Sequence, residues 1–343
     1  MPKVAVIGSG FGGLAIAIRL QANGFDVHLF EKRDRPGGRA YVYEDQGFTF
    51  DAGPTVITDP SCLEELFTLS NRNIADYVTL EPIQPFYRLY WEDGYQFDYT
   101  NDDDLLYNQI KRKSAVDEDG YRRFLAYTEE VFEEGYLKLG HVPFLDFRSM
   151  LQAAPQLIRL QSYRSVYSMV AKFIKDEQLR QAFSFHTLLV GGNPFTTSAI
   201  YTLIHPLERK WGVLFARGGT GALVQGLAKL FRDLGGSLHL EQPINRIQTS
   251  NGVVSGVITD PGKIYEVELV VSNADVVHTY EKLLPENPYA AQKTRQLKRK
   301  RFSPSLFVTY FGVKKIYDNL CHHSILFGPR YKDLIGEIYK GPD

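Results

Sequence analysis

The feature that most constrains this chain is a glycine-rich turn between an apolar strand and a helix. Val4 to Ile7 is a short apolar run of the kind found in parallel sheets, and Gly8-Ser9-Gly10-Phe11-Gly12-Gly13 follows it directly. A helix is predicted over residues 14–22, ending before Gly24, and a second strand over residues 25–30. This order predicts a βαβ unit within an α/β domain that has a parallel sheet.

The glycines have separate expected tasks in such a unit. Gly8 permits the tight turn, Gly10 lets the backbone approach a diphosphate, and Gly13 lets the helix pack closely on the strand. The helix N-terminus then presents N–H groups and the positive end of its dipole to phosphates. Glu31 ends the second strand, where a carboxylate binds ribose hydroxyls. These residues predict a site for an ADP-containing dinucleotide, without separating FAD from NAD.

Two segments after Glu31 narrow the choice of dinucleotide. Arg35-Pro36-Gly37-Gly38-Arg39 follows almost at once, and Asp51-Ala52-Gly53-Pro54-Thr55 comes shortly afterwards. Adjacent glycines suit a close backbone approach to a charged group, and Arg39 offers paired donors to phosphate or flavin oxygens. From the residues alone, a plain surface turn stays an alternative for the first segment.

Taken together, these motifs resemble the N-terminal flavin site of the amine oxidase and phytoene desaturase superfamily. Narrower matches resemble the bacterial-type phytoene desaturases and extend over essentially the whole chain. They are the segments 38–43, 48–60, Val190-Gly191-Gly192-Asn193-Pro194-Phe195, Ile200-Tyr201, Arg217-Gly218-Gly219-Thr220-Gly221-Ala222-Leu223 and Ser272-Asn273-Ala274-Asp275.

The resemblance implies FAD as the cofactor and assigns residues to it. Gly8, Gly10, Gly13 and Glu31 are expected to hold the ADP half, Gly38 and Arg39 to lie along the diphosphate and ribityl chain, Pro54 and Thr55 to lie near the flavin ring, and Ile244 to bind the adenine through its backbone. The expected fold is α/β, with a discontinuous Rossmann-like FAD-binding domain over 1–85 and 206–288. An inserted α+β domain over 86–205 and 289–343 is expected to face substrate and membrane.

The implied reaction is the FAD-dependent desaturation of phytoene to more conjugated carotenes such as lycopene. A hydride passes to flavin N5 and a proton is lost, and oxygen or a quinone is the final electron acceptor. No catalytic residue is assigned. Another oxidase of the superfamily, acting on an amine or a different isoprenoid, and a membrane-associating fragment without catalysis are the alternatives. Family members continue to a second glycine-rich flavin motif, and no such motif precedes Gly341-Pro342-Asp343.

Composition excludes several other classes of protein. The formal net charge is −1, whereas a nucleic-acid binder usually carries a clear basic excess. Cys62 and Cys321 give no metal-ligand spacing and no disulfide framework, so no metal site is expected. No run of about 18 apolar residues occurs. Since Lys3 to Ile7 already forms a strand pattern rather than a signal peptide, we expect a cytoplasmic protein, peripheral on the cytoplasmic membrane.

A basic amphipathic stretch from Arg148 to Lys175 is the expected membrane contact, and a helix packed on its own core is the alternative. The histidines at 186, 205, 278, 322 and 323 are assigned to structural roles. Asp275 is expected either to cap a helix or to serve the cofactor.

The hydrophobic pattern of the remaining sequence predicts further helices and strands. Residues 86–91 and 95–99 predict a hairpin around Asp93-Gly94, and residues 102–190 predict mostly helix, with Pro143 and Pro155 as breakers. A helix is expected from about 221 to 234. Strands are expected at 237–240, 253–259, 265–271 and 302–313.

Overall fold

The N-terminal strand forms the centre of a parallel sheet because its side chains are buried on both faces. In the computed structural model, which describes residues 1–260 and 262–340, β1 (Lys3–Ile7) pairs in parallel with β2 (Asp26–Phe30) and with β13 (Leu269–Ser272). Strand β9 (Ser237–His239) pairs with β2, which gives the order β13-β1-β2-β9. The α/β fold class with a parallel sheet is confirmed.

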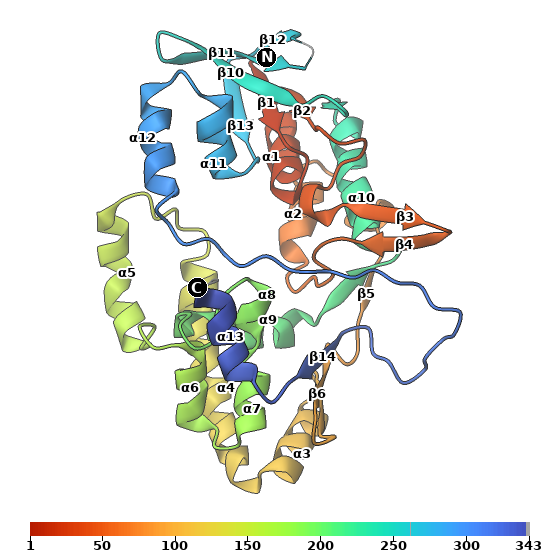
Figure 1. Cartoon of the computed structure of the whole chain (residues 1–343), viewed down its shortest axis with the longest axis vertical. Helices are drawn as coiled ribbons and strands as arrows, with labels where there is room; N and C mark the ends of the chain where they lie inside the picture. Colours follow the sequence, from red (N-terminus) through yellow and green to blue (C-terminus); the bar gives the residue numbers. More distant parts are fainter. Residues whose placement is uncertain (261, 341–343) are drawn as a thin grey trace. The chain divides into compact units, whose positions relative to one another are not determined.

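Each face of this sheet is covered by a different layer (Figure 1). Val6 and Leu29 belong to a buried cluster with Leu14 of α1 (Phe11–Ala22) and Phe231 of α10 (Thr220–Asp233). On the other face, a second buried cluster joins the β1–β2 pair to an antiparallel sheet formed by β10 (Ile244–Ser250), β11 (Val253–Thr259) and β12 (Ile264–Glu266). Successive side chains of β1 and β2 point to opposite faces of the sheet, so one set packs on the helices and the other set packs on the antiparallel sheet.

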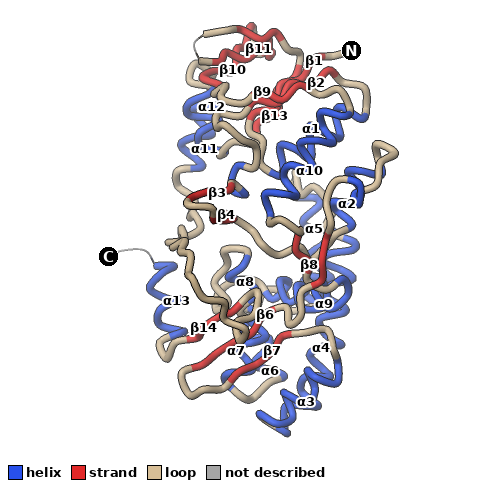
Figure 2. The backbone as a smooth tube through the Cα atoms, turned by 90° about the vertical axis from the view of Figure 1, so that its right-hand side faces the viewer, coloured by secondary structure: helices blue, strands red, loops and turns tan. Residues whose placement is uncertain are grey.

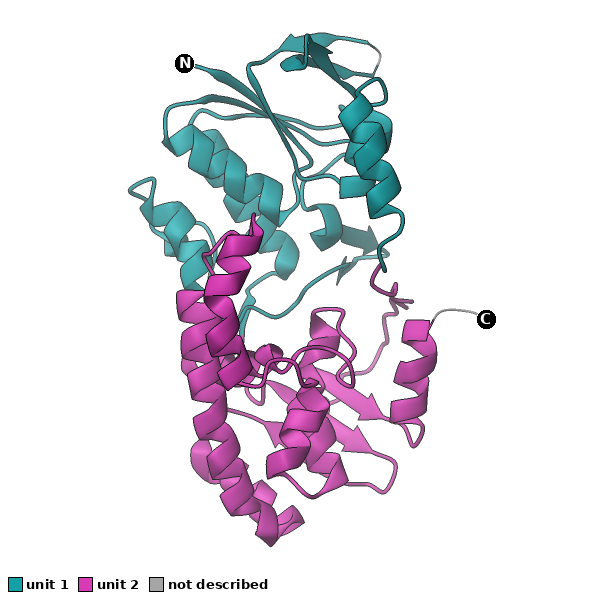
Figure 3. Ribbon diagram, turned by 90° about the vertical axis from the view of Figure 1, so that its left-hand side faces the viewer, with its two compact units in different colours: residues 1–81, 214–301 teal, residues 82–213, 302–343 magenta. Residues whose placement is uncertain are grey.

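The chain forms two compact units, residues 1–81 with 214–301 and residues 82–213 with 302–343 (Figure 3). The predicted boundaries lie at 85, 205 and 288, so the largest difference concerns residues 289–301. These residues belong to unit 1, where Ala290 and Thr294 of α12 (Pro288–Leu297) are buried. Unit 1 also contains η1 (Gly38–Ala40), β3 (Val42–Asp45), β4 (Phe48–Asp51), α2 (Ser61–Thr68), η2 (Ile74–Asp76), β8 (Leu214–Ala216), α11 (Val276–His278) and η6 (Thr279–Leu283), and β5 (Leu80–Pro82) ends at its boundary.

Unit 2 consists mainly of helices around a small group of short strands (Figure 2). The predicted hairpin is present as β6 (Tyr87–Trp91) and β7 (Gln96–Tyr99), and β14 (Ser324–Phe327) adds to it in parallel with β6. Fully buried rings of Tyr87, Tyr99 and Phe183 lie in its interior. Its other elements are α3 (Asp103–Lys113), η3 (Ala115–Asp117), α4 (Glu118–Phe132), η4 (Glu133–Lys138), α5 (Phe147–Arg159), α6 (Val166–Phe173), α7 (Glu177–Ser184), α8 (His186–Leu189), η5 (Ala199–Leu203), α9 (Ile204–Trp211) and α13 (Tyr331–Lys340).

Two strand predictions are wrong in detail. The run 265–271 is divided between β12, which pairs antiparallel with β11, and β13, which pairs parallel with β1. The segment 302–313 is not a strand: it belongs to none of the sheets within residues 1–260 and 262–340, and its Phe307 side chain is 96% exposed. An apolar alternating pattern gives a strand only where a partner supplies the ladder of hydrogen bonds.

The helical prediction for residues 102–190 needs one correction. Pro155 does not break the chain's helix but lies inside α5, so one backbone N–H is missing from the helix without ending it. The basic stretch 148–175 contains more than one helix. It divides into α5 and α6, and α6 buries Val166, Met169 and Val170 in the core. None of the helices within residues 1–260 and 262–340 is long and apolar enough to cross a bilayer.

Candidate functional site

The glycine turn brings α1 onto β1 at a distance that only glycine permits. Gly8 has a φ of +92°, and its N–H donates to the carbonyl of Phe30 at 2.8 Å. A Cβ atom at Gly13 would stand 1.8 Å from the Gly8 carbonyl oxygen. Gly13 therefore lies behind the turn and fixes the contact between helix and strand.

The turn leaves the first N–H groups of α1 directed outward. The helix begins after Gly10, which caps it without a side-chain hydrogen bond. The first N–H groups of any helix have no partner within it, and the dipole adds partial positive charge there. This end of α1 is therefore suited to an anion such as a diphosphate.

The second glycine pair lies directly against the first. Gly37 donates its N–H to the Ser9 carbonyl at 3.0 Å, and a Cβ at Gly38 would stand 3.0 Å from Gly10 Cα. Both Gly37 and Gly38 have positive φ angles, of +128° and +57°. The surface turn that the sequence left open thus belongs to the same site. Arg39 follows it with an exposed guanidinium that makes no ion pair or hydrogen bond within the described residues.

Glu31 is 5% exposed, and its carboxylate organises the turn from within. One oxygen, Oε2, accepts from the Ser9 N–H at 3.0 Å and from Ser9 Oγ at 2.6 Å, and Oε1 accepts from the Arg33 N–H at 3.1 Å. Each carboxylate oxygen has two lone pairs, so acceptor capacity is left for a ribose hydroxyl. Ser9 has no place in the sequence argument, yet it couples the carboxylate to the glycine turn.

The segment from Asp51 to Thr55 joins the site to α10. The Asp51 carboxylate accepts from the N–H groups of Thr220 at 2.9 Å and Gly221 at 3.1 Å, and so caps the N-terminus of α10. Thr220 Oγ1 donates to the Pro54 carbonyl at 2.6 Å. A Cβ at Gly53 would stand 2.2 Å from the Arg39 carbonyl oxygen. Two motifs that are far apart in the sequence thus form one structural junction.

These segments enclose a cavity of about 780 Å³ in unit 1. Seven of the nine predicted site residues line it: Gly8, Gly10, Glu31, Gly38, Arg39, Pro54 and Ile244. Gly13 lies behind the turn, and Thr55 lines a neighbouring apolar cavity of about 300 Å³ that Phe11 and Pro54 also border.

The lining of the large cavity also includes Asn273, Asp275 and Gln242. The Asn273 side chain lies on the glycine turn, with Oδ1 2.6 Å from where a Gly12 Cβ would stand. Asp275 caps α11 through the N–H groups of Val277 and His278 and also lines the cavity, so both of its expected roles stay available. Gln242 borders the cavity next to Ile244. Asn273 belongs to the same motif as Asp275, Ser272-Asn273-Ala274-Asp275, but no ligand contact was expected of Asn273.

The residues fit FAD in three respects. The α1 N-terminus and the unpaired Arg39 would hold the diphosphate, and Glu31 would bind a ribose. Ile244 offers apolar surface and backbone groups to the adenine. The volume of the cavity lies in the range of about 300–1,000 Å³ that small-molecule and cofactor sites occupy. No cluster of metal-ligating side chains occurs within residues 1–260 and 262–340.

Comparison with known proteins decides the family. The model of the flavin containing amine oxidoreductases matches residues 11–333. A lycopene-forming phytoene desaturase from Pantoea ananas is 60% identical over 99% of this chain and 69% of its own length. A protein of the same name from Pseudescherichia vulneris is 59% identical, with the same coverage. The chain belongs to the phytoene desaturase family. The neurosporene-forming phytoene desaturase of Rhodobacter capsulatus is a more distant member, at 37% identity.

Solved structures share the fold of this chain. Putrescine oxidase bound to putrescine superposes with a TM-score of 0.60 at 16% identity, covering 86% of this chain and 63% of its own. An oxidoreductase from Methanosarcina mazei gives 0.57 at 18% identity, covering 86% and 64%. At these identities the likeness shows the fold alone. The chain spans just under two thirds of the length of these structures.

Proposed function

We propose that this chain binds FAD in the large cavity of unit 1 and desaturates phytoene to more conjugated carotenes such as lycopene. The observation that carries the proposal is the identity of 60%, 59% and 54% to three lycopene-forming phytoene desaturases, over nearly the whole chain. The cavity at the glycine turn supports it, because its donors match a diphosphate and its carboxylate a ribose.

FAD supplies the redox chemistry when it is bound, since its ring accepts a hydride from an allylic carbon while the neighbouring carbon loses a proton. The protein's share is to bind, to orient and to exclude water. Gly38 and Arg39 are proposed to position the diphosphate and ribityl chain. Pro54 and Thr55, which border the apolar cavity, are proposed to position the flavin ring. Oxygen or a quinone would take the electrons afterwards.

Unit 1 is thus proposed to be the FAD-binding domain and unit 2 the substrate and membrane-associating domain. A C40 hydrocarbon offers no hydrogen-bonding group, so it must be delivered from lipid and selected by shape. Unit 2 presents a surface suited to lipid on α5 and the loop before it. Leu145 is 89% exposed, Phe147 76% and Ile158 64%, and Arg148 beside them makes no ion pair within the described residues.

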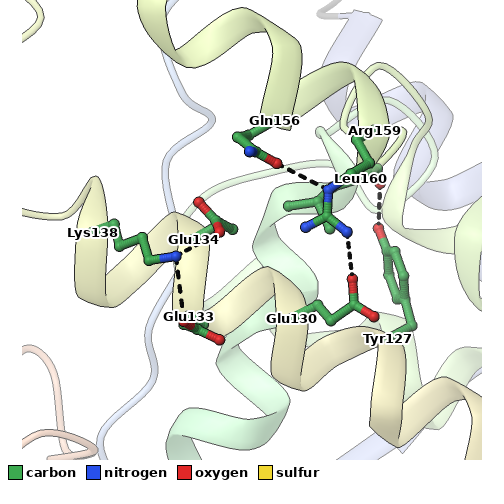
Figure 4. Close-up of polar contacts among 8 residues, drawn as sticks. All are labelled: Tyr127, Glu130, Glu133, Glu134, Lys138, Gln156, Arg159 and Leu160. Carbon is green, nitrogen blue, oxygen red and sulfur yellow. Dashed lines mark hydrogen bonds and ion pairs between the residues drawn. The ribbon is translucent and has the colours of Figure 1, made fainter.

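The C-terminal end of α5 is held to α4 by polar contacts (Figure 4). Arg159 Nη1 lies 2.9 Å from Glu130 Oε2, and Tyr127 Oη donates to the Leu160 carbonyl at 2.8 Å. Arg159 is therefore paired and does not add to the basic surface. The lipid contact proposed here rests on the apolar side chains more than on charge, and we place the protein in the cytoplasm, peripheral on the cytoplasmic membrane.

The proposal is tested by supplying the purified chain with FAD and liposomes that contain phytoene, then separating the products by chromatography. Products with longer conjugation are expected from the unaltered chain. An Arg39→Ala chain should retain less FAD and form less product, and a Lys229→Ala chain should match the unaltered one, since Lys229 is exposed on α10 away from the cavity. Stoichiometric FAD binding without any new polyene would contradict the assigned substrate.

A further inference from the structure

Two histidines from neighbouring strands share a hydrogen bond in unit 1. His28 of β2 and His239 of β9 approach to 3.0 Å between Nδ1 and Nε2, and their rings stack at 5.3 Å and 11°. The Phe30 ring extends the stack, 4.7 Å from that of His239. Because Phe30 is paired with His239 in the parallel sheet, the ladder itself holds the two imidazoles side by side.

The charges around this histidine pair differ at its two ends. Asp26 Oδ1 lies 3.7 Å from His28 Nε2. On the other side, Lys263 Nζ lies 4.4 Å from the ring centre of Tyr265, which packs on His239 at 5.4 Å. Burial, then His28, then Lys263 lower the pKa of His239. The hydrogen bond between the two rings needs one facing nitrogen that carries a proton and one that does not, and the lowered pKa of His239 keeps that ring neutral near neutral pH.

The histidine pair is connected to the wall of the large cavity. The His239 carbonyl accepts from the Glu31 N–H at 2.8 Å. Tyr265 Oη donates to Gln242 Oε1 at 3.1 Å, and the Gln242 N–H donates to the Glu31 carbonyl at 2.9 Å. Phe30, Glu31 and Gln242 all line the cavity. A change in the distance between β2 and β9 would therefore move the residues proposed to hold the ribose and adenine.

We propose that the His28–His239 pair makes FAD retention sensitive to acid. A single proton fits between the two rings, because one nitrogen donates and the other accepts. When acid protonates both rings, two N–H donors and two positive charges lie 3.0 Å apart, so the pair separates and the ladder between β2 and β9 loosens. FAD affinity then falls as the pH drops. This inference rests on the proposed function, in which the cavity holds FAD.

The test measures the FAD dissociation constant of the full chain by quenching of flavin fluorescence, with and without a titrating pair. In His239→Gln the amide oxygen still accepts from His28 but does not protonate. Between about pH 7.5 and pH 5.5 the dissociation constant of the unaltered chain should rise several-fold, with about tenfold as the limit for one proton, and that of His239→Gln by less than about twofold. His141→Gln, which removes an exposed histidine of unit 2, should behave as the unaltered chain.

Other outcomes would overturn the inference. His278 also lines the cavity, and its protonation would tighten diphosphate binding in acid, so affinity that rises with acidification contradicts a role for the pair. Equal acid sensitivity in the unaltered chain and His239→Gln does the same. If His239→Gln does not fold, His28→Gln gives the same comparison. No FAD binding even at neutral pH would overturn the proposed function together with this inference.

Discussion

Replacing Gly13 with alanine should destroy the FAD site while leaving unit 2 folded. The new Cβ would stand 1.8 Å from the Gly8 carbonyl oxygen, about 1.2 Å short of the closest approach that Cβ atoms show. Neither atom belongs to a flexible side chain, so α1 itself must move away from β1. Leu14, Ala17 and Ile18 of α1 are fully buried, and they would lose contacts in the core of unit 1.

The expected magnitude follows from these buried residues. Overpacking alone costs about 1–3 kcal/mol, and losing the contacts of a single buried Leu or Ile costs about 2–5 kcal/mol. We therefore expect Gly13→Ala to destabilise unit 1 by at least about 3 kcal/mol, a large part of the stability of an ordinary domain. Gly12→Ala is the matched control, because its Cβ meets only the movable Asn273 side chain, at 2.6 Å.

The assay uses the position of the two tryptophans, Trp91 and Trp211, which both lie in unit 2. Their fluorescence in urea reports the unfolding of unit 2, and the circular dichroism of the helices reports both units. Gly13→Ala should lose FAD binding and show an earlier transition by circular dichroism, with an unchanged fluorescence transition. Gly12→Ala should keep both transitions. Normal FAD affinity and stability in Gly13→Ala would refute the argument from the close approach of helix and strand.

Three further outcomes are expected. Glu31→Ala should weaken FAD binding at least about tenfold, about 1.4 kcal/mol, because it removes a ribose partner and the hydrogen bonds to Ser9. Equilibrium dialysis measures the FAD affinity, and an unchanged affinity would show that Glu31 does not belong to the site. Asp51→Ala should lower the free energy of unfolding by about 1–2 kcal/mol, because it removes the cap of α10. The urea midpoint followed by circular dichroism should fall, and an unchanged midpoint would contradict the capping role. Burial first, then Arg209, lowers the pKa of His205 well below its usual range. Below about pH 6.5 the unfolded chain therefore binds a proton at His205 that the folded chain does not. The free energy of unfolding of unit 2 should be constant above about pH 6.5 and fall by up to about 1.4 kcal/mol per pH unit below it. Tryptophan fluorescence in urea measures this loss of stability at each pH. If a His205→Gln chain loses stability with the same dependence on pH, another group causes the loss.

Local pattern was enough to predict the elements around the glycine turn. Gly8, Gly13 and Glu31 lie within one βαβ unit, where spacing along the chain fixes spacing in the structure. The hairpin at Asp93-Gly94 was predictable for the same reason, since a two-strand unit with a tight turn depends only on neighbouring residues.

Contacts between distant segments could not be predicted in this way. The His28–His239 bond joins residues 211 positions apart, and it exists only because β9 pairs with β2. The capping of α10 by Asp51 likewise depends on how separate segments pack. The run 265–271 looked like one strand because all of its residues suit a strand, whereas the division between two sheets is decided by their partners.

The measurement that tests the central claim most directly is anaerobic incubation of the FAD-loaded chain with phytoene in liposomes, following flavin and carotenoid absorption together. The account predicts that the flavin bands bleach while new long-wavelength polyene bands grow in proportion. An oxidised flavin that stays unbleached, with no new polyene bands, would contradict the assignment of this chain as a functioning phytoene desaturase.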